Sequence, residues 1–239
     1  MMLTSAALLL AATPTLAQGT NAFEGARFGL EYDHYDDGEG FTISAVEASA
    51  DASFRFSGGF GFQLGLGYLK ETDSSDEYLD LENQKVGELH AFYDVTPELR
   101  LGGLLAYDSY NDGDYLYALE GIYATAPLRL EARIGKFDSD FEPAMLYELH
   151  ASYEVIENAR LRGMARSVNY EDGFGHYQVF SLGGSYDVLE NIRLYGDYGW
   201  NENDFGDGYV LNGSLVTLGV TIGLGGPIND KQFTYSPFY

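Results

Sequence analysis

Tyr186-Asp-Val-Leu-Glu-Asn-Ile-Arg-Leu-Tyr-Gly-Asp-Tyr-Gly-Trp200 is the stretch that decides the fold class. Its two arms alternate apolar and charged residues on either side of a short polar turn. Successive side chains of a strand point to opposite faces, so Ile192 and Leu194 share one face and Arg193 takes the other. The stretch therefore predicts a tight β-hairpin with one apolar face and one charged face.

The same hairpin pattern recurs three more times at intervals of roughly 30 residues, which is the spacing of an internal repeat. The further copies span residues 93–101, 123–130 and 153–161. A water-soluble sandwich would bury its apolar face and keep most aromatic residues inside. A continuous sheet of such hairpins, apolar on one side and charged on the other, is typical of a barrel whose outer wall faces lipid.

The composition of the 239-residue chain is compatible with such a barrel and excludes several other classes. No run of about twenty apolar residues occurs, which excludes a membrane-spanning helix but not spanning strands. The 20 tyrosines and 30 glycines suit the interfacial girdles and bent strands of a barrel. The absence of cysteine excludes disulfides and thiolate metal sites. A net charge of −24 argues against nucleic acid as a partner, because binding to phosphate requires clustered Lys and Arg.

The first 17 residues read as a secretory signal peptide. An apolar core over Leu8–Ala12 precedes Thr15-Leu16-Ala17, a small-residue cleavage site, so the mature chain is expected to begin near Gln18. The segment carries no Lys or Arg before its apolar core, and the alternative is a disordered hydrophobic start on a cytoplasmic protein. We favour export, with a short lead over residues 18–23.

The rest of the chain predicts an all-β, antiparallel, up-and-down transmembrane β-barrel of about twelve strands over residues 24–224, with ten or fourteen also possible. The first strand is expected at about 24–33, the second at about 41–56 and the last at about 209–224. Short turns alternate with longer acidic loops near 70–84, 108–114, 136–143, 168–176 and 201–208. This asymmetry is typical of outer-membrane barrels, and an even strand number returns both termini to the periplasmic side.

In this architecture the chain resembles a small Gram-negative outer-membrane β-barrel of the porin-like kind. The resemblance covers residues 24–224 and implies a location in the outer membrane, with lipid and lipopolysaccharide as its surroundings. Barrels of this class often end in an aromatic residue that the insertion machinery recognises, and this chain ends in Phe238-Tyr239. The last strand, however, stops near Leu224. Residues 225–239 are therefore expected to form a periplasmic tail, unless its aromatic residues pair elsewhere.

Arginines recur near the start of the upward strands and, by parity, point into the barrel. The functional interpretation is a selectivity belt, since rings of charged side chains set ion preference in pores. The structural interpretation is cross-strand pairing, which stabilises a sheet by roughly 0.2–1 kcal/mol per pair. The lumen candidates are Arg55, Arg100, Arg129, Arg133, Arg160, Arg162, Arg166 and Arg193, with the carboxylates Asp94, Glu154 and Asp187 as expected partners of Arg100, Arg160 and Arg193.

Other polar groups suggest chemistry only weakly. Two copies of Glu-Leu-His-Ala place His90 and His150 inward beside Glu88 and Glu148, where a metal or a base could sit, but repeat ancestry explains the duplication more simply. The acidic loops offer oxygen ligands without the full spacing of a calcium loop. We expect no catalytic residue, no metal ligand and no cofactor.

The preferred function is a passive channel for small hydrophilic solutes or ions, with an acidic mouth above an Arg-, Glu- and Asp-lined lumen. The first alternative is a non-conducting structural or interaction barrel filled by charge pairs. An outer-membrane enzyme is a third hypothesis, and a soluble, halophile-like β-protein is a fourth. The solute, the ion selectivity and the oligomeric state are left open.

Overall fold

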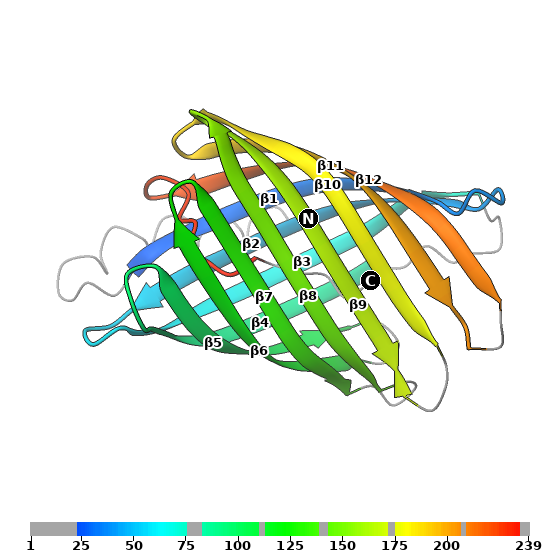
Figure 1. Ribbon diagram of the computed structural model, residues 1–239, viewed down its shortest axis with the longest axis horizontal. Coiled ribbons are helices and arrows are strands. Elements are labelled where there is room, and N and C mark those ends of the chain that lie inside the picture. The colour runs from blue at the N-terminus through cyan, green and yellow to red at the C-terminus, as the bar shows by residue number, and fades with distance from the viewer. Residues whose placement is uncertain are drawn as a thin grey trace, which may run out of the picture.

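The computed structural model describes residues 23–75, 83–109, 113–138, 143–171, 175–206 and 209–234. Within these ranges, twelve antiparallel strands close into one barrel, as predicted (Figure 1). The strands are β1 (Phe23–Asp36), β2 (Thr42–Arg55), β3 (Phe60–Ser74), β4 (Asn83–Asp94), β5 (Leu99–Asp108), β6 (Asp114–Thr125), β7 (Leu128–Asp138), β8 (Ala144–Ile156), β9 (Ala159–Tyr170), β10 (His176–Leu189), β11 (Ile192–Asp204) and β12 (Val210–Leu224).

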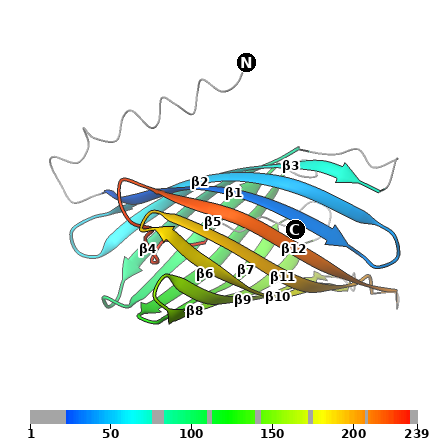
Figure 2. The same cartoon turned by 90° about the horizontal axis from the view of Figure 1, so that it is seen from above.

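Each strand pairs with its neighbours in sequence, and β1 pairs with β12 to close the sheet. The closing register runs from Ala26 opposite Leu224 to Asp36 opposite Ser214. Figures 1 and 2 both show the blue β1 beside the orange β12. Closure leaves no strand edge open, so each strand satisfies its backbone groups against two neighbours, as a hydrocarbon environment requires.

The outward face of the barrel is apolar, because the period-two alternation puts aliphatic and aromatic residues on that side of every strand. Leu66, Leu119 and Leu182 are 65%, 71% and 60% exposed near the middle of their strands. Tyr68, Tyr107, Tyr147, Tyr198 and Trp200 also point outward and are exposed, and aromatic residues of this kind are expected at the membrane interface. This surface is the one expected to contact lipid.

Short turns join the strands at one end of the barrel. The turns between β6 and β7, β8 and β9, and β10 and β11 each leave only two residues outside the strands. In the second of these turns Asn158 adopts a positive φ of 66°, a conformation that asparagine tolerates better than most residues. At the opposite end the connections are longer, and most of the acidic residues predicted to fill them, among them Asp112, Asp140 and Asp207, lie outside the described residues.

The tail after β12 folds back into the interior of the barrel. Residues 225–234 leave the last strand at the short-turn end and fold among the strands, where Figure 1 draws them in red. Gln232 and Phe233 are 1% and 0% exposed. The sequence predicts a tail on the periplasmic side, with pairing of its aromatic residues elsewhere as the alternative. Phe233 is paired inside the lumen, and residues 235–239 lie outside the described residues.

In the part of the chain that the structure describes, no helix is long and apolar enough to span a membrane.

Candidate functional site

The lumen is not lined by charge throughout. On the side of β5, β6, β8 and β9, near the longer loops, inward side chains form an apolar cluster that fills this part of the lumen. The prediction of an Arg-, Glu- and Asp-lined lumen is wrong for this region, because these strands carry apolar residues on both faces and parity alone does not separate the two. The cluster consists of Leu104, Ala106, Leu116, Ala118, Ala144, Leu146 and Val168, with Phe137, Tyr170 and Tyr177 packed against it.

A buried charge network centred on Arg133 lies next to this cluster, on the side of the short-turn end. Its guanidinium is 3.0 Å from Glu148, 3.4 Å from Glu120 and 3.5 Å from Glu131. All four side chains are at most 1% exposed. Arg166 approaches the second oxygen of Glu148 to 2.6 Å. Buried carboxylates are tolerated only when they are paired, so these residues hold one another in place.

The two predicted Glu–His pairs belong to the same layer. His90 contacts Glu120 at 2.7 Å and Glu88 at 3.3 Å, and its ring is fully buried. His150 contacts Glu148 at 2.9 Å. Both histidines point inward, as parity predicted. Among the residues that the structure describes, no group of three or more His, Asp or Glu side chains could hold a metal ion.

Arginines from the wall hold the backbone of the tail. Every carbonyl from Asp230 to Thr234 accepts a hydrogen bond from a guanidinium, an arrangement that satisfies the backbone of a segment that lies outside the strands. The pairs are Arg129 Nε to Asp230 O (2.7 Å), Arg100 Nη1 to Lys231 O (2.8 Å), Arg129 Nη2 to Gln232 O (3.1 Å), Arg27 Nη2 to Phe233 O (2.6 Å) and Arg133 Nη2 to Thr234 O (3.1 Å).

Phe233 is the apolar anchor of the tail. Its ring stacks on His90 with centroids 5.1 Å apart and lies 6.3 Å from the ring of Phe92. The Gln63 side chain bonds both to the Phe233 N–H and to its carbonyl, each at 2.9 Å. The tail therefore packs as part of the interior, with both polar and apolar contacts.

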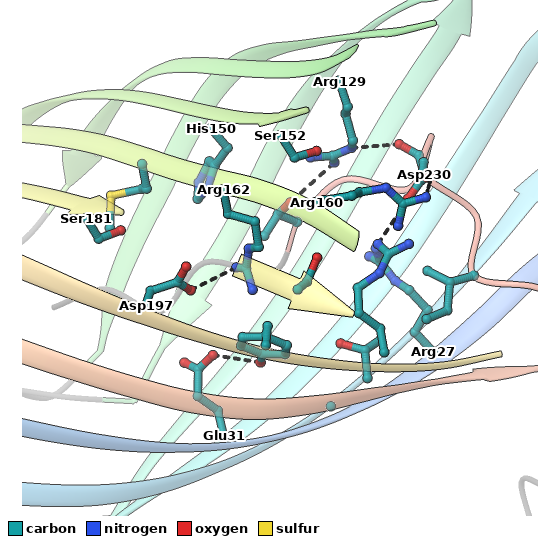
Figure 3. Close-up of a pocket in the computed structure, with 18 of the residues that line it drawn as sticks. Arg27, Glu31, Arg129, His150, Ser152, Arg160, Arg162, Ser181, Asp197 and Asp230 are labelled. Carbon is teal, nitrogen blue, oxygen red and sulfur yellow. Dashed lines mark hydrogen bonds and ion pairs between the residues drawn. The ribbon is translucent and has the colours of Figure 1, made fainter. Parts of the chain in front are cut away.

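The other side of the lumen contains a cavity of about 200 Å³, mainly against β1, β2 and β8–β12 (Figure 3). Small inward residues leave this space open, among them Gly29, Ser49, Ser152, Ser181 and Thr221. Glycine and serine at these positions occupy far less volume than the leucines and phenylalanine of the filled side.

Charged groups meet in pairs on the cavity wall. Arg162 is 3.3 Å from Asp197 and lies over the ring of Tyr195, 4.4 Å from its centroid. The Tyr195 hydroxyl donates to Glu31 at 2.7 Å. Figure 3 shows Arg162 and Asp197 pointing toward each other, with Glu31 farther along the same wall of the cavity. Arg162 stays 31% exposed, so its charge faces the open space.

A second charged group joins the wall to the tail. Arg160 and Arg193 share Asp187, at 2.7 and 2.6 Å, and both also reach the Asp230 carboxylate of the tail. Asp230 is 37% exposed and lines the cavity. The tail thus contributes one wall of the open space.

The structure places all eight predicted arginines on the inward face. The predicted pairs Asp94–Arg100 and Asp187–Arg193 form at 2.8 and 2.6 Å. Glu154 and Arg160 form a longer ion pair of 3.8 Å, and Arg160 lies closer to Asp187, at 2.7 Å. Arg55 lies at the short-turn end, 3.0 Å from Asp94. Sequence reasoning did not select several inward groups that share the same parity, namely Arg27, Glu31, Glu131, Tyr195 and Asp197, nor Asp230 in the tail.

The sequence profile described as Gram-negative porin matches residues 47–206. The chain belongs to this family. The porin is therefore an outer-membrane β-barrel that acts as a channel for small hydrophilic solutes, and its family is one of transport proteins. No curated protein matches the chain.

Solved structures of other outer-membrane channels share the fold. The structure titled KdgM porin in complex with disordered oligogalacturonate is 14% identical, with a TM-score of 0.56, and the match covers 81% of this chain and 98% of that one. The NanC porin is 10% identical (TM-score 0.58, 82% and 98% covered). The CymD monoaromatic hydrocarbon channel is 10% identical (TM-score 0.56, 83% and 88% covered). At these identities the likeness is one of fold alone.

Proposed function

We propose that solutes cross the porin through the cavity against β1, β2 and β8–β12, and that the charged pairs on its wall set ion preference. The observation that carries this proposal is the asymmetry of the lumen. The apolar cluster and the Arg133 network fill the region bordered by β5–β7 and the loop-side parts of β8 and β9, whereas small residues leave open the region against β1, β2 and the remainder of β8–β12. A twelve-stranded barrel has a narrow interior, so a path must follow the side where side chains leave room.

The lining of this path is balanced in charge. The cavity is bordered by five arginines (Arg27, Arg129, Arg160, Arg162, Arg193) and five carboxylates (Glu31, Glu47, Asp51, Asp197, Asp230). With equal numbers of both signs, the net field along the path is weak, and wild-type porin is expected to discriminate only modestly between anions and cations. Removing a single charge from the wall should therefore have a visible effect.

Replacing Arg162 with alanine is expected to shift the reversal potential of the channel toward cation selectivity. The substitution removes one positive charge from the path and leaves Asp197 and Glu31 facing it. Refolded protein in a planar bilayer under a salt gradient provides the measurement. Lys136→Ala is the matched control: it also removes one positive charge, but from an exposed side chain that pairs with Glu171 at 2.8 Å. An equal shift in both variants would contradict the proposed path.

The runner-up is a non-conducting barrel whose interior is held shut by the tail and the buried network. It is supported by the number of wall arginines that bond to the tail. Under this alternative, properly folded protein stays silent in the bilayer, and Arg162→Ala lowers the free energy of unfolding by only about 0.2–1 kcal/mol, the loss of one partly exposed ion pair.

We further propose that the exposed outer surface contacts outer-membrane lipid and lipopolysaccharide, because that surface is apolar along the middle of every strand and aromatic toward its ends.

The proposed function involves no catalytic activity. Incubation with ester, peptide and glycoside substrates should give no turnover above that of empty detergent micelles.

A further inference from the structure

The Asp230 carboxylate occupies a site formed by two arginines. Arg160 Nη2 reaches Oδ2 at 3.4 Å, and Arg193 Nη1 reaches Oδ1 at 3.1 Å. Each guanidinium therefore donates to a different oxygen of one planar carboxylate. Two donors that each meet a different oxygen of the same group match a carboxylate in shape as well as in charge.

The arginine pair is held by the wall and not by the tail. Asp187 accepts from Arg160 Nη1 at 2.7 Å, and from Arg193 Nε at 2.6 Å and Nη2 at 3.1 Å. All three residues lie on the barrel strands β9, β10 and β11. The remaining N–H groups, Arg160 Nη2 and Arg193 Nη1, are the ones that meet Asp230. The site would keep its shape if Asp230 left.

Asp230 is the replaceable member of this group. It belongs to the tail, its carboxylate is 37% exposed, and it lines the cavity that a solute would enter. Without Asp230 the two arginines face Asp187 and the more distant Glu154, which is 3.8 Å from Arg160 and 35% exposed. A single added carboxylate would restore the present contacts. A doubly charged phosphate would place both of its charges at the site, close to Asp187 and Glu154, which disfavours it. A dicarboxylate such as succinate would present one carboxylate to the arginines and keep its second charge several bonds away, in the open cavity.

We propose that Arg160 and Arg193 form a carboxylate-binding site that holds the chain's own Asp230 at rest, and that a carboxylate-bearing solute entering the cavity takes the place of Asp230 and loosens the tail. This inference rests on the proposed path, because a solute must reach the cavity to meet the site. It gives the tail a role as a tethered competitor for the solute, and it identifies small carboxylates as the solute class.

Trypsin cleavage after Lys231 reports directly on release of the tail. While the tail lies in the lumen, the Lys231 carbonyl accepts a hydrogen bond from Arg100 and the next two residues are buried. The protease therefore cannot bind this part of the chain in its active site. Full-length porin, refolded in detergent micelles, is treated with trypsin in sodium chloride, sodium succinate or sodium phosphate at equal ionic strength. Mass spectrometry follows release of the peptide from Gln232 to Tyr239. Each rate is divided by that of a synthetic peptide of the same tail sequence, because residue 230 itself affects trypsin.

Succinate is expected to raise the normalised cleavage rate of the wild type several-fold over chloride, and phosphate to raise it less. Asp230→Asn keeps the shape but removes the charge, and it is expected to be cleaved roughly tenfold faster in chloride, with no further response to succinate. Glu157→Gln, an exposed substitution in the short turn between β8 and β9, is the matched control and should behave as the wild type.

Equal normalised rates for the wild type and Asp230→Asn would overturn the proposal, as would a wild-type rate that succinate leaves unchanged. Phosphate acting as strongly as succinate would overturn the assignment to carboxylates. The wild-type comparison needs no variant and so does not depend on the folding of one. Because cleavage requires no conduction, a silent bilayer together with succinate-dependent cleavage would reject the proposed path and leave the site standing.

Discussion

Replacing Arg133 with methionine is expected to lower the free energy of unfolding of the barrel by about 3–5 kcal/mol, the cost of breaking a buried ion pair by removing one partner. Arg133 is the shared partner of Glu120, Glu131 and Glu148. Methionine fills much of the same volume but removes the positive charge that compensates three buried carboxylates. The measurement is the urea unfolding curve of the protein refolded in lipid vesicles, followed by tryptophan fluorescence.

Two further variants make this test specific. Lys136→Met lies on the same strand but replaces an exposed side chain, and it should change the free energy of unfolding by no more than about 1 kcal/mol. The double variant Arg133→Met/Glu120→Gln also removes one of the buried carboxylates left without its arginine, and it should recover part of the lost free energy of unfolding. An Arg133→Met barrel as stable as the wild type would mean that the network is not what holds this side of the lumen together.

Truncation of the tail after Gly226 is expected to raise single-channel conductance several-fold. The tail occupies the lumen at the short-turn end, and its removal leaves a wider passage beside the same walls. Protein refolded in vitro is used, so that any role of the C-terminal residues in insertion does not affect the result. Conductance in symmetric potassium chloride is compared with that of the full-length chain.

Phe233→Ala provides a milder version of the same experiment in the full-length chain. Loss of a buried phenylalanine ring costs about 3–5 kcal/mol, so the tail should be held far less tightly. Frequent transitions between the wild-type and the truncated conductance levels are expected. A truncated barrel with the conductance of the full-length chain would show that the tail does not obstruct the path.

Much of the barrel follows from the period-two pattern. Twelve strands, their approximate bounds, the outward aromatic residues and the inward direction of all eight candidate arginines are predictable because one face must meet lipid. The pairing of charges is less predictable. The strand register shifts between Glu154 and Ile156 and again between Asp187 and Leu189. Near these irregularities, Arg160 lies closer to Asp187 (2.7 Å) than to its predicted partner Glu154 (3.8 Å).

The two features that sequence reasoning missed have no local signal. The tail over residues 225–234 has neither strand nor helix periodicity, and it is held mainly through its backbone carbonyls, which every residue carries. The apolar cluster arises where segments such as Leu104-Leu105-Ala106 are apolar on both faces. Alternation cannot then tell the lumen from the lipid side, and only the closed barrel brings these inward residues together.

The most direct test of the proposed path is thiol modification of single-cysteine variants during conductance recording. The chain contains no cysteine, so only the introduced residue reacts. Ser152 lines the cavity, and Ala118 lies in the apolar cluster of the filled side. A positively charged methanethiosulfonate reagent is predicted to reduce the current through Ser152→Cys and to leave Ala118→Cys unchanged. A current through Ser152→Cys that the reagent leaves unchanged, together with a current through Ala118→Cys that it blocks, would contradict the proposed path.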